Sequence, residues 1–148
     1  MKKFFIAALA ALAIGTTAFA GPSTVKTKVQ NHFASSFSKA QDVTWTSNGK
    51  FQQVSFVLNK EKVTAYYDVY GDLVGTTKNL AFDKLPKSAI EYITSTYTFP
   101  DYQLKECIEF VNADNDKKYF ASFETEEGTV VLEINENGRV EVFQGSVL

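Results

Sequence analysis

The sequence has few of the residues on which catalytic or disulfide-linked proteins depend. Among its 148 residues there is one cysteine, Cys107, and one histidine, His32. A single cysteine excludes an intramolecular disulfide, and a single histidine leaves little for a metal site or a catalytic triad. The motifs GxSxG, HExxH, GxxxxGK[ST] and GxGxxG are all missing. We therefore expect no catalytic residues, no metal site and no cofactor.

Positive charge is also scarce in the part of the chain that we expect to remain after processing. Without Lys2 and Lys3 the 15 basic residues fall to 13, against 17 acidic residues, so the net charge is −4. Arg139 is the only arginine in the sequence. Binding of nucleic acid requires a stripe of basic residues that neutralises phosphates. We therefore expect no nucleic-acid partner.

The first twenty residues have the order of a secretory signal peptide. Lys2 and Lys3 precede an apolar run, and Ala18-Phe19-Ala20 has the small-x-small pattern of a cleavage site. The apolar run is shorter than the roughly 20 residues that a membrane-spanning helix needs. Glycine rather than cysteine follows the site, which argues against a lipoprotein anchor. We expect cleavage between Ala20 and Gly21, a periplasmic or secreted product, and no membrane span in the mature chain.

Two segments of the mature chain carry apolar residues at every fourth position, which is the spacing along one face of an α-helix. The first helix has Ser23 or Thr24 as a cap, and Pro86 suits the first turn of the second helix. The sequence therefore predicts two helices of similar design. Their stripes are Val25, Val29, Phe33 and Phe37 in the first segment and Leu85, Ala89, Ile93 and Tyr97 in the second.

After each predicted helix the apolar period changes to two, which indicates β-strands. The two halves contain similar hairpins, YYDVYGDLVGTT at 66–77 and LEINENGRVEVFQ at 132–144. Gly71 in the first hairpin corresponds to Gly138 in the second. The strand residues that we expect to face the core are Val43, Trp45, Phe56 and Tyr67 in the first half and Ile108, Phe110, Phe123 and Ile134 in the second.

These patterns predict an α+β fold made of two tandem repeats, each a helix followed by a four-stranded antiparallel sheet. The predicted parts are a signal peptide at 1–20, a first repeat at 21–77, a connector at 78–84 and a second repeat at 85–148. A single helix covers only one face of such a sheet. Duplication would allow two sheets to join or pack, which buries edges that one unit would expose.

Four short stretches give the chain a resemblance to a known family. Their order and spacing resemble those of the beta-lactamase-inhibitor-like (BLIP-like), PepSY-like family of exported bacterial proteins, over nearly all of the mature chain. In that family a helix precedes a sheet twice, a tryptophan precedes the first hairpin, and D-x-x-G or N-x-x-G sequences form turns. The stretches are DVTW at 42–45, YYDVYGDLV at 66–74, LPKSAIEYITSTY at 85–97 and EINENGRV at 133–140.

The resemblance implies a BLIP-like fold, export from the cytoplasm, and binding of proteins or peptides rather than catalysis. The inhibitors related to that family dock on an enzyme through the open face of a continuous sheet. This chain lacks their disulfides, since Cys107 is its only cysteine. Inhibition of a β-lactamase is therefore not part of what the resemblance implies for it.

His32 and Cys107 are the side chains best suited to catalysis or metal binding, but a structural role explains each of them. His32 lies beside the apolar stripe of the first helix with no second ligand at a helical spacing, which is typical of a partly buried structural histidine. A thiol enzyme would pair Cys107 with His32, and nothing around either residue indicates such a pair. A half-buried strand thiol is the preferred interpretation.

Two carboxylate-rich turns contain some of the oxygen ligands that calcium uses. DVYGD contains Asp68 and Asp72, and NADNDKK contains Asp114 and Asp116. Calcium loops need more oxygen ligands in a fixed order, and neither stretch supplies that order. Asn, Asp and Gly are also the residues that tight hairpin turns require. We therefore interpret both stretches as turns.

The strand face opposite the helices carries large side chains. Alternation along the strands places Tyr66, Val74, Phe120, Val131 and Phe143 on this face. A mixed aromatic and aliphatic face with a charged rim is typical of a docking surface. We predict a non-catalytic exported module that binds a protein or peptide of the cell envelope there, with inhibition of the partner as one form of that function. The alternatives are small-ligand binding and a structural envelope protein whose homodimer buries this face.

Overall fold

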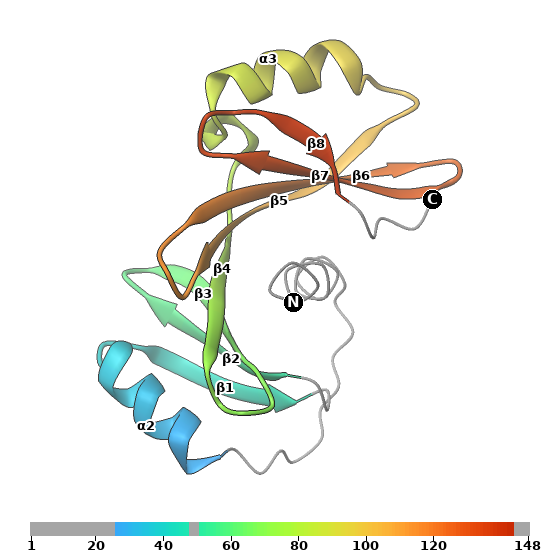
Figure 1. Cartoon of the computed structure of the whole chain (residues 1–148). Helices are drawn as coiled ribbons and strands as arrows, with labels where there is room; N and C mark the ends of the chain where they lie inside the picture. The colour runs from blue at the N-terminus through green and yellow to red at the C-terminus, as the bar shows by residue number, and fades with distance from the viewer. Residues whose placement is uncertain (1–25, 48–50, 144–148) are drawn as a thin grey trace. The chain divides into compact units, whose positions relative to one another are not determined.

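The computed structural model of the protein describes residues 26–47 and 51–143. The predicted signal peptide, its cleavage site and the cap residues Ser23 and Thr24 lie outside these residues. Within them, two α-helices, one short 3₁₀-helix and eight strands follow one another (Figure 1). The strands form an eight-stranded antiparallel sheet in the order β1 to β8. The prediction of an α+β fold is confirmed, and the tandem repeat stays a prediction.

The elements occur in two groups. The first is α2 (Thr27–Ser36), β1 (Gln41–Ser47), β2 (Gln52–Leu58), β3 (Glu61–Tyr67) and β4 (Leu73–Asn79). The second is η1 (Phe82–Lys84), α3 (Lys87–Thr96), β5 (Gln103–Asn112), β6 (Lys117–Thr125), β7 (Gly128–Asn135) and β8 (Val140–Val142). Because β4 extends to Asn79, the first two residues of the predicted connector continue the strand.

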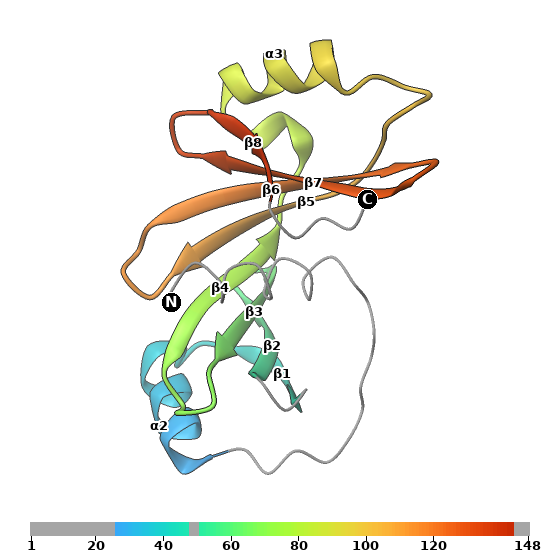
Figure 2. The same ribbon diagram turned by 45° about the vertical axis from the view of Figure 1, so that its right-hand side comes forward.

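The chain divides into two compact units, each with one helix along one face of its strands (Figures 1 and 2). Within the described residues, the α2 unit holds the chain up to Lys78 together with Val111–Asn115. The α3 unit holds Asn79–Phe110 and the chain from Asp116 onward. The end of the β5–β6 hairpin thus belongs to the α2 unit.

The core of the α2 unit lies between α2 and the strand face beneath it. Its buried side chains are Val29, Phe33, Val54, Phe56, Ala65 and Tyr67. Trp45 packs at the edge of this core, where its ring meets that of Phe33 edge-on at 5.2 Å. The predicted inward positions of Phe56 and Tyr67 are confirmed, and Trp45 is half-buried.

Val43 does not share the burial that its alternation with Trp45 predicts, because it is 40% exposed. The register between β1 and β2 shifts between Gln41 and Thr44, and Asp42 has a positive φ of 52°. An irregularity of this kind breaks the strict alternation of side chains. The prediction that Val43 faces the core is therefore wrong.

The core of the α3 unit is built in the same way, with one difference from the prediction. Its buried side chains are Leu85, Ala89, Ile93, Cys107, Ala121, Phe123, Val130, Leu132 and Ile134. Cys107 is the contribution of β5, whereas Ile108 and Phe110 are 2% exposed but lie outside this cluster. The inward positions of Phe123 and Ile134 are confirmed. The predicted burial of Ile108 and Phe110 is also confirmed, but neither residue belongs to the cluster under α3, where Cys107 takes the place that was expected for them.

Candidate functional site

In the α2 unit, two of the predicted docking residues lie on neighbouring strands. Tyr66 stands between two core residues of β3, so its side chain points away from α2. It is 2% exposed, and its hydroxyl accepts a hydrogen bond from Thr77 Oγ1 at 3.4 Å. Val74 is half-buried and lies where the pairing of β3 with β4 shifts by one residue. This bulge had no signal in the alternation of the sequence.

In the α3 unit, the structure brings the other three predicted residues together. Phe120 and Val131 alternate with residues of the core under α3, so both side chains point to the opposite face. The rings of Phe120 and Phe143 meet edge-on at 5.4 Å. The backbone N–H of Phe143 donates to the carbonyl of Val131 at 2.8 Å, which holds the segment after β8 against β7.

The five residues differ in how much of their surface reaches solvent. Tyr66, Phe120 and Val131 are 2%, 1% and 8% exposed, while Val74 and Phe143 are half-buried. The assignment of the five residues to a docking surface stays a prediction.

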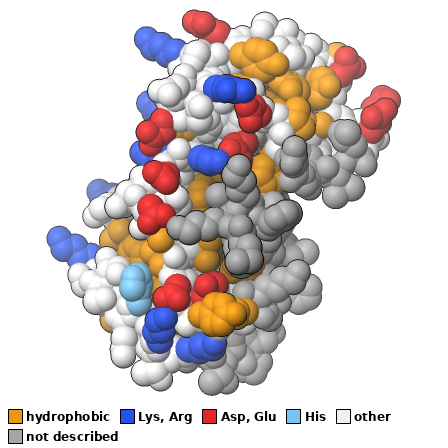
Figure 3. All heavy atoms as spheres, in the orientation of Figure 1, with side chains coloured by type: hydrophobic (Ala, Val, Ile, Leu, Met, Phe, Trp, Pro, Cys, Tyr) orange, Lys and Arg blue, Asp and Glu red, His pale blue; other side chains and the backbone are white. Residues whose placement is uncertain are grey.

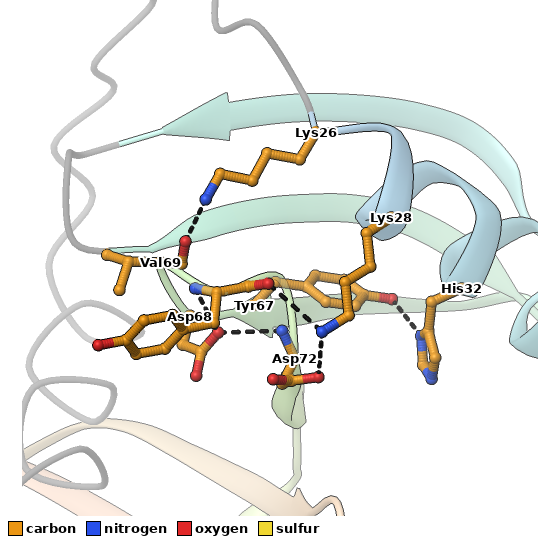
Figure 4. A network of polar contacts seen from close by, with 8 residues as sticks. Lys26, Lys28, His32, Tyr67, Asp68, Val69 and Asp72 are labelled. Carbon is orange, nitrogen blue, oxygen red and sulfur yellow. Dashed lines mark hydrogen bonds and ion pairs between the residues drawn. The ribbon is translucent and has the colours of Figure 1, made fainter.

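A network of polar contacts joins α2 to the turn between β3 and β4 (Figure 4). Asp68 Oδ1 accepts hydrogen bonds from the backbone N–H groups two and four residues further on, at 2.8 and 2.9 Å. Lys28 forms an ion pair with Asp72 at 2.7 Å, and Lys26 donates to the backbone carbonyl of Val69. The carboxylate of Asp68 therefore holds the turn, and that of Asp72 joins it to the helix.

The second acidic segment is also a turn. Asn112 Oδ1 accepts a hydrogen bond from the backbone N–H of Asp114 at 2.9 Å, and Asn115 has a positive φ of 66°. Turn chemistry is thus confirmed at both acidic segments. Among the residues that the structure describes, no group of three or more His, Cys, Asp or Glu side chains could hold a metal ion.

His32 contacts a tyrosine of the core. Its Nδ1 lies 3.0 Å from the hydroxyl oxygen of Tyr67, and the two rings meet edge-on at 5.5 Å (Figure 4). Burial raises the pKa of Tyr67 to about 12, so the phenol stays protonated at neutral pH. The contact joins α2 to β3 and agrees with a structural role, although His32 is more exposed than the sequence predicts.

The sequence predicts a half-buried thiol at Cys107, but the residue is buried more deeply. It is 4% exposed and lies within the core of the α3 unit. Burial, with a smaller contribution from the carboxylate of Glu106, raises the pKa of Cys107 to about 11. A cysteine nucleophile reacts as the thiolate. At neutral pH this thiol is protonated and surrounded by apolar side chains, which makes it a poor nucleophile.

Sequence reasoning missed a group of exposed aromatic residues at the end of α3. Phe99 is 78% exposed and Tyr92 is 47% exposed. The run YTFPDY at 97–102 was the available signal, because it places three aromatic residues around a proline in a segment between a helix and a strand. An apolar stripe or alternation does not reveal such a group, since Phe99 belongs to the loop after α3 and Tyr92 lies in α3 outside the predicted stripe.

The fold occurs in solved structures of other bacterial proteins. A DUF2874 family protein from Bacteroides ovatus matches with a TM-score of 0.67 at 16% identity, over 81% of this chain and 89% of that chain. A BLIP-like protein from Bacteroides fragilis matches with a TM-score of 0.66 at 14% identity, over 89% and 94%. The chain has a BLIP-like fold. A proposed periplasmic protein from Bacteroides eggerthii also matches, with a TM-score of 0.67 at 11% identity, over 84% and 93%.

The match to the BLIP-like protein agrees with the resemblance seen in the sequence, and at such low identities all three neighbours show the fold alone. No protein-family model and no curated protein matches the sequence. Among the described residues, no helix has the length and the hydropathy that crossing a membrane requires.

Proposed function

We propose that this BLIP-like chain is an exported, non-catalytic module that binds a protein or peptide through the sheet face opposite its helices. The observation that carries the proposal is the group of Phe120, Val131 and Phe143 in the α3 unit, on the face that α3 does not cover. The sheet of this unit has large apolar side chains on both faces and a helix on only one of them. On the face without the helix, Phe120 and Val131 are 1% and 8% exposed and Phe143 is half-buried, so a partner would mainly contact Phe143 and the surface around it.

Two further observations support the proposal. Cys107 is buried and protonated, and His32 is engaged with Tyr67, so neither is prepared for catalysis. None of the neighbours is named as an enzyme, and the one from Bacteroides eggerthii is described as periplasmic, which agrees with the signal-like start of the chain.

We also propose that the segments 21–77 and 85–148 are tandem repeats of one unit. The order of a helix and four strands in both groups of elements supports this repeat. The turns give independent support. The oxygen of Asp68 or Asn135 accepts from the backbone N–H four residues later, at 2.9 Å in both turns. A glycine with positive φ, Gly71 or Gly138, precedes that residue.

The experiment uses the mature protein as bait in the envelope fraction of the producing bacterium, followed by affinity measurement with the purified partner. The face variant carries Val74→Ala and Phe143→Ala, because these two residues are half-buried and their truncation should leave the fold intact. The matched control carries Val69→Ala and Val142→Ala, which remove apolar side chains that are 49% and 56% exposed elsewhere.

We expect the face variant to lose about tenfold or more in affinity, as for other residues at the centre of an interface, and the control to bind normally. Equal affinity of the two variants, with unchanged circular dichroism spectra, would show that this face does not bind the partner. If the face joins two copies of the chain, sedimentation will show a mass that rises with concentration and that the face variant lacks.

A further inference from the structure

Aromatic side chains gather where α3 ends and β5 begins, within the α3 unit. This α3 aromatic patch consists of Tyr92, Tyr97, Phe99 and Tyr102. Phe99 is 78% exposed and Tyr92 is 47% exposed, while Tyr97 and Tyr102 are half-buried. The backbone N–H of Tyr102 donates to the carbonyl of Thr98 at 3.0 Å, which closes the loop that carries Phe99.

Three of the four rings, those of Tyr92, Tyr97 and Tyr102, are connected to the core by ring contacts. The ring of Tyr97 stacks on that of Phe123 at 5.7 Å and meets the rings of Tyr102 and Tyr92 edge-on at 5.0 and 6.3 Å. Phe123 itself is 3% exposed and belongs to the core of the α3 unit. Rings held in this way lose little side-chain freedom when a partner binds, which favours binding. Single exposed hydrophobic side chains need no explanation, but a connected group that reaches the surface indicates an interaction site.

The charges around the α3 aromatic patch are acidic. Figure 3 shows hydrophobic side chains over this part of the unit with acidic side chains beside them. The sequence contains no lysine or arginine at 88–104 or at 119–138. Lys105 is ion-paired with Glu124. Glu91 and Asp101 lie in the same segment as the patch, and Glu126 and Glu127 lie in the turn after β6, the strand that carries Phe123. None of these four carboxylates has a cationic partner among the described residues.

We propose that the α3 aromatic patch binds a lysine- or arginine-bearing segment of another protein. A cation is attracted to the face of an aromatic ring within about 6 Å of its centre, and exposed rings such as Phe99 offer that face. A guanidinium group can stack on a ring and pair with a carboxylate at the same time. The nearby carboxylates favour a basic partner over an acidic one. This site uses none of the residues of the proposed docking face and stands independently of it.

The test is a titration of the ¹⁵N-labelled mature protein with an end-capped peptide of alternating arginine and alanine. A peptide of the same length with glutamate in place of arginine is the charge control. We expect saturable shifts of amide signals at 92–104 with the arginine peptide only, and weaker binding as salt is raised. Phe99→Ser should raise the Kd about fivefold. Glu126→Lys with Glu127→Lys should also raise it.

The matched control is Val142→Ser, which removes another exposed hydrophobic side chain of the same unit and should leave the Kd unchanged. Tyr92→Ser repeats the test at a second position of the patch, should the Phe99 variant fold poorly. Three results would overturn the proposal. They are no saturable binding of the arginine peptide, equal binding of the two peptides, and patch variants that bind as tightly as Val142→Ser.

Discussion

Replacing Gly138 by alanine should destabilise the protein more than replacing Gly71, although the two glycines occupy matching places in similar turns. Gly71 has a φ of +84° and Gly138 a φ of +81°, a region in which a side chain at Cβ is strained. This backbone strain costs about 1–2 kcal/mol of unfolding free energy at either position. The difference between the two variants must therefore come from what surrounds the added methyl group.

The surroundings are much tighter at Gly138. A Cβ atom there would lie 2.0 Å from Ser88 Oγ and 3.2 Å from the backbone nitrogen of Ala89. At Gly71 the nearest atom is a side-chain methyl of Val29 at 3.2 Å, followed by the flexible side chain of Lys28 at 3.3 Å. Side chains can move by a few tenths of an ångström more readily than a helix backbone can.

Ser88 can rotate away from the new methyl group, but it then loses the hydrogen bond from its Oγ to the carbonyl of Asn137 at 3.2 Å. That loss costs about 1 kcal/mol, and the strain against the start of α3 adds about 1 kcal/mol. We therefore expect Gly71→Ala to cost about 1–2 kcal/mol and Gly138→Ala about 3–4 kcal/mol.

The assay is urea unfolding followed by far-ultraviolet circular dichroism, which reports on both units, with the slopes compared between variants. The Ser88→Ala background separates the two sources of cost. In that background the hydroxyl is absent, so the penalty of Gly138→Ala should shrink by about 1 kcal/mol, while that of Gly71→Ala should not change. Equal penalties for the two glycines, or no change in the Ser88→Ala background, would refute this reasoning.

Four further predictions concern the core and its titratable groups. Trp45→Ala should lower the free energy of unfolding by about 2–3 kcal/mol and Phe123→Ala by about 3–5 kcal/mol, because Phe123 is buried and Trp45 is half-buried. Equal decreases of the unfolding free energy in urea titrations of the two variants would contradict this. Cys107, with its pKa raised from 9.0 to about 11, should resist iodoacetamide until the protein unfolds, and fast labelling of the native protein would revive the idea of a thiol enzyme. Because the unfolded thiol loses its proton first, stability should fall between pH 9 and about 11, and Cys107→Ala should lessen that fall. Tyr67 should ionise near pH 12, so Tyr67→Phe should remove a late step from the ultraviolet titration of the tyrosines, and an unchanged curve would count against its burial.

The elements that the sequence determined by itself are those whose signals are local. The four-residue stripes predicted both helices, and Ala89 and Ile93 indeed face the core. The D-x-x-G and N-x-x-G turns were recognised because a positive φ favours glycine and because Asp or Asn can accept backbone hydrogen bonds within a few residues. Such preferences depend on neighbours in the chain, so they can be read before the tertiary structure is known.

The tertiary structure decided which face of a strand turns inward. β5 has apolar side chains at Cys107, Ile108 and Phe110, which point to opposite faces of the strand. The sequence therefore allows either face to lie under α3, and only the packing shows that it is the face with Cys107. The irregularity at Asp42 moves Val43 out of the core, whereas Trp45, two positions later, still packs against Phe33.

The candidate sites depend on the tertiary structure in the same way. The sequence placed Phe120 and Phe143 on one face, but neither their ring contact nor the near-complete burial of Phe120 follows from the alternation. Likewise, Tyr97 meets Phe123 only because α3 packs across the strands that follow it. Burial and ring contacts depend on residues that are far apart in the sequence, so no local pattern of residues predicts them.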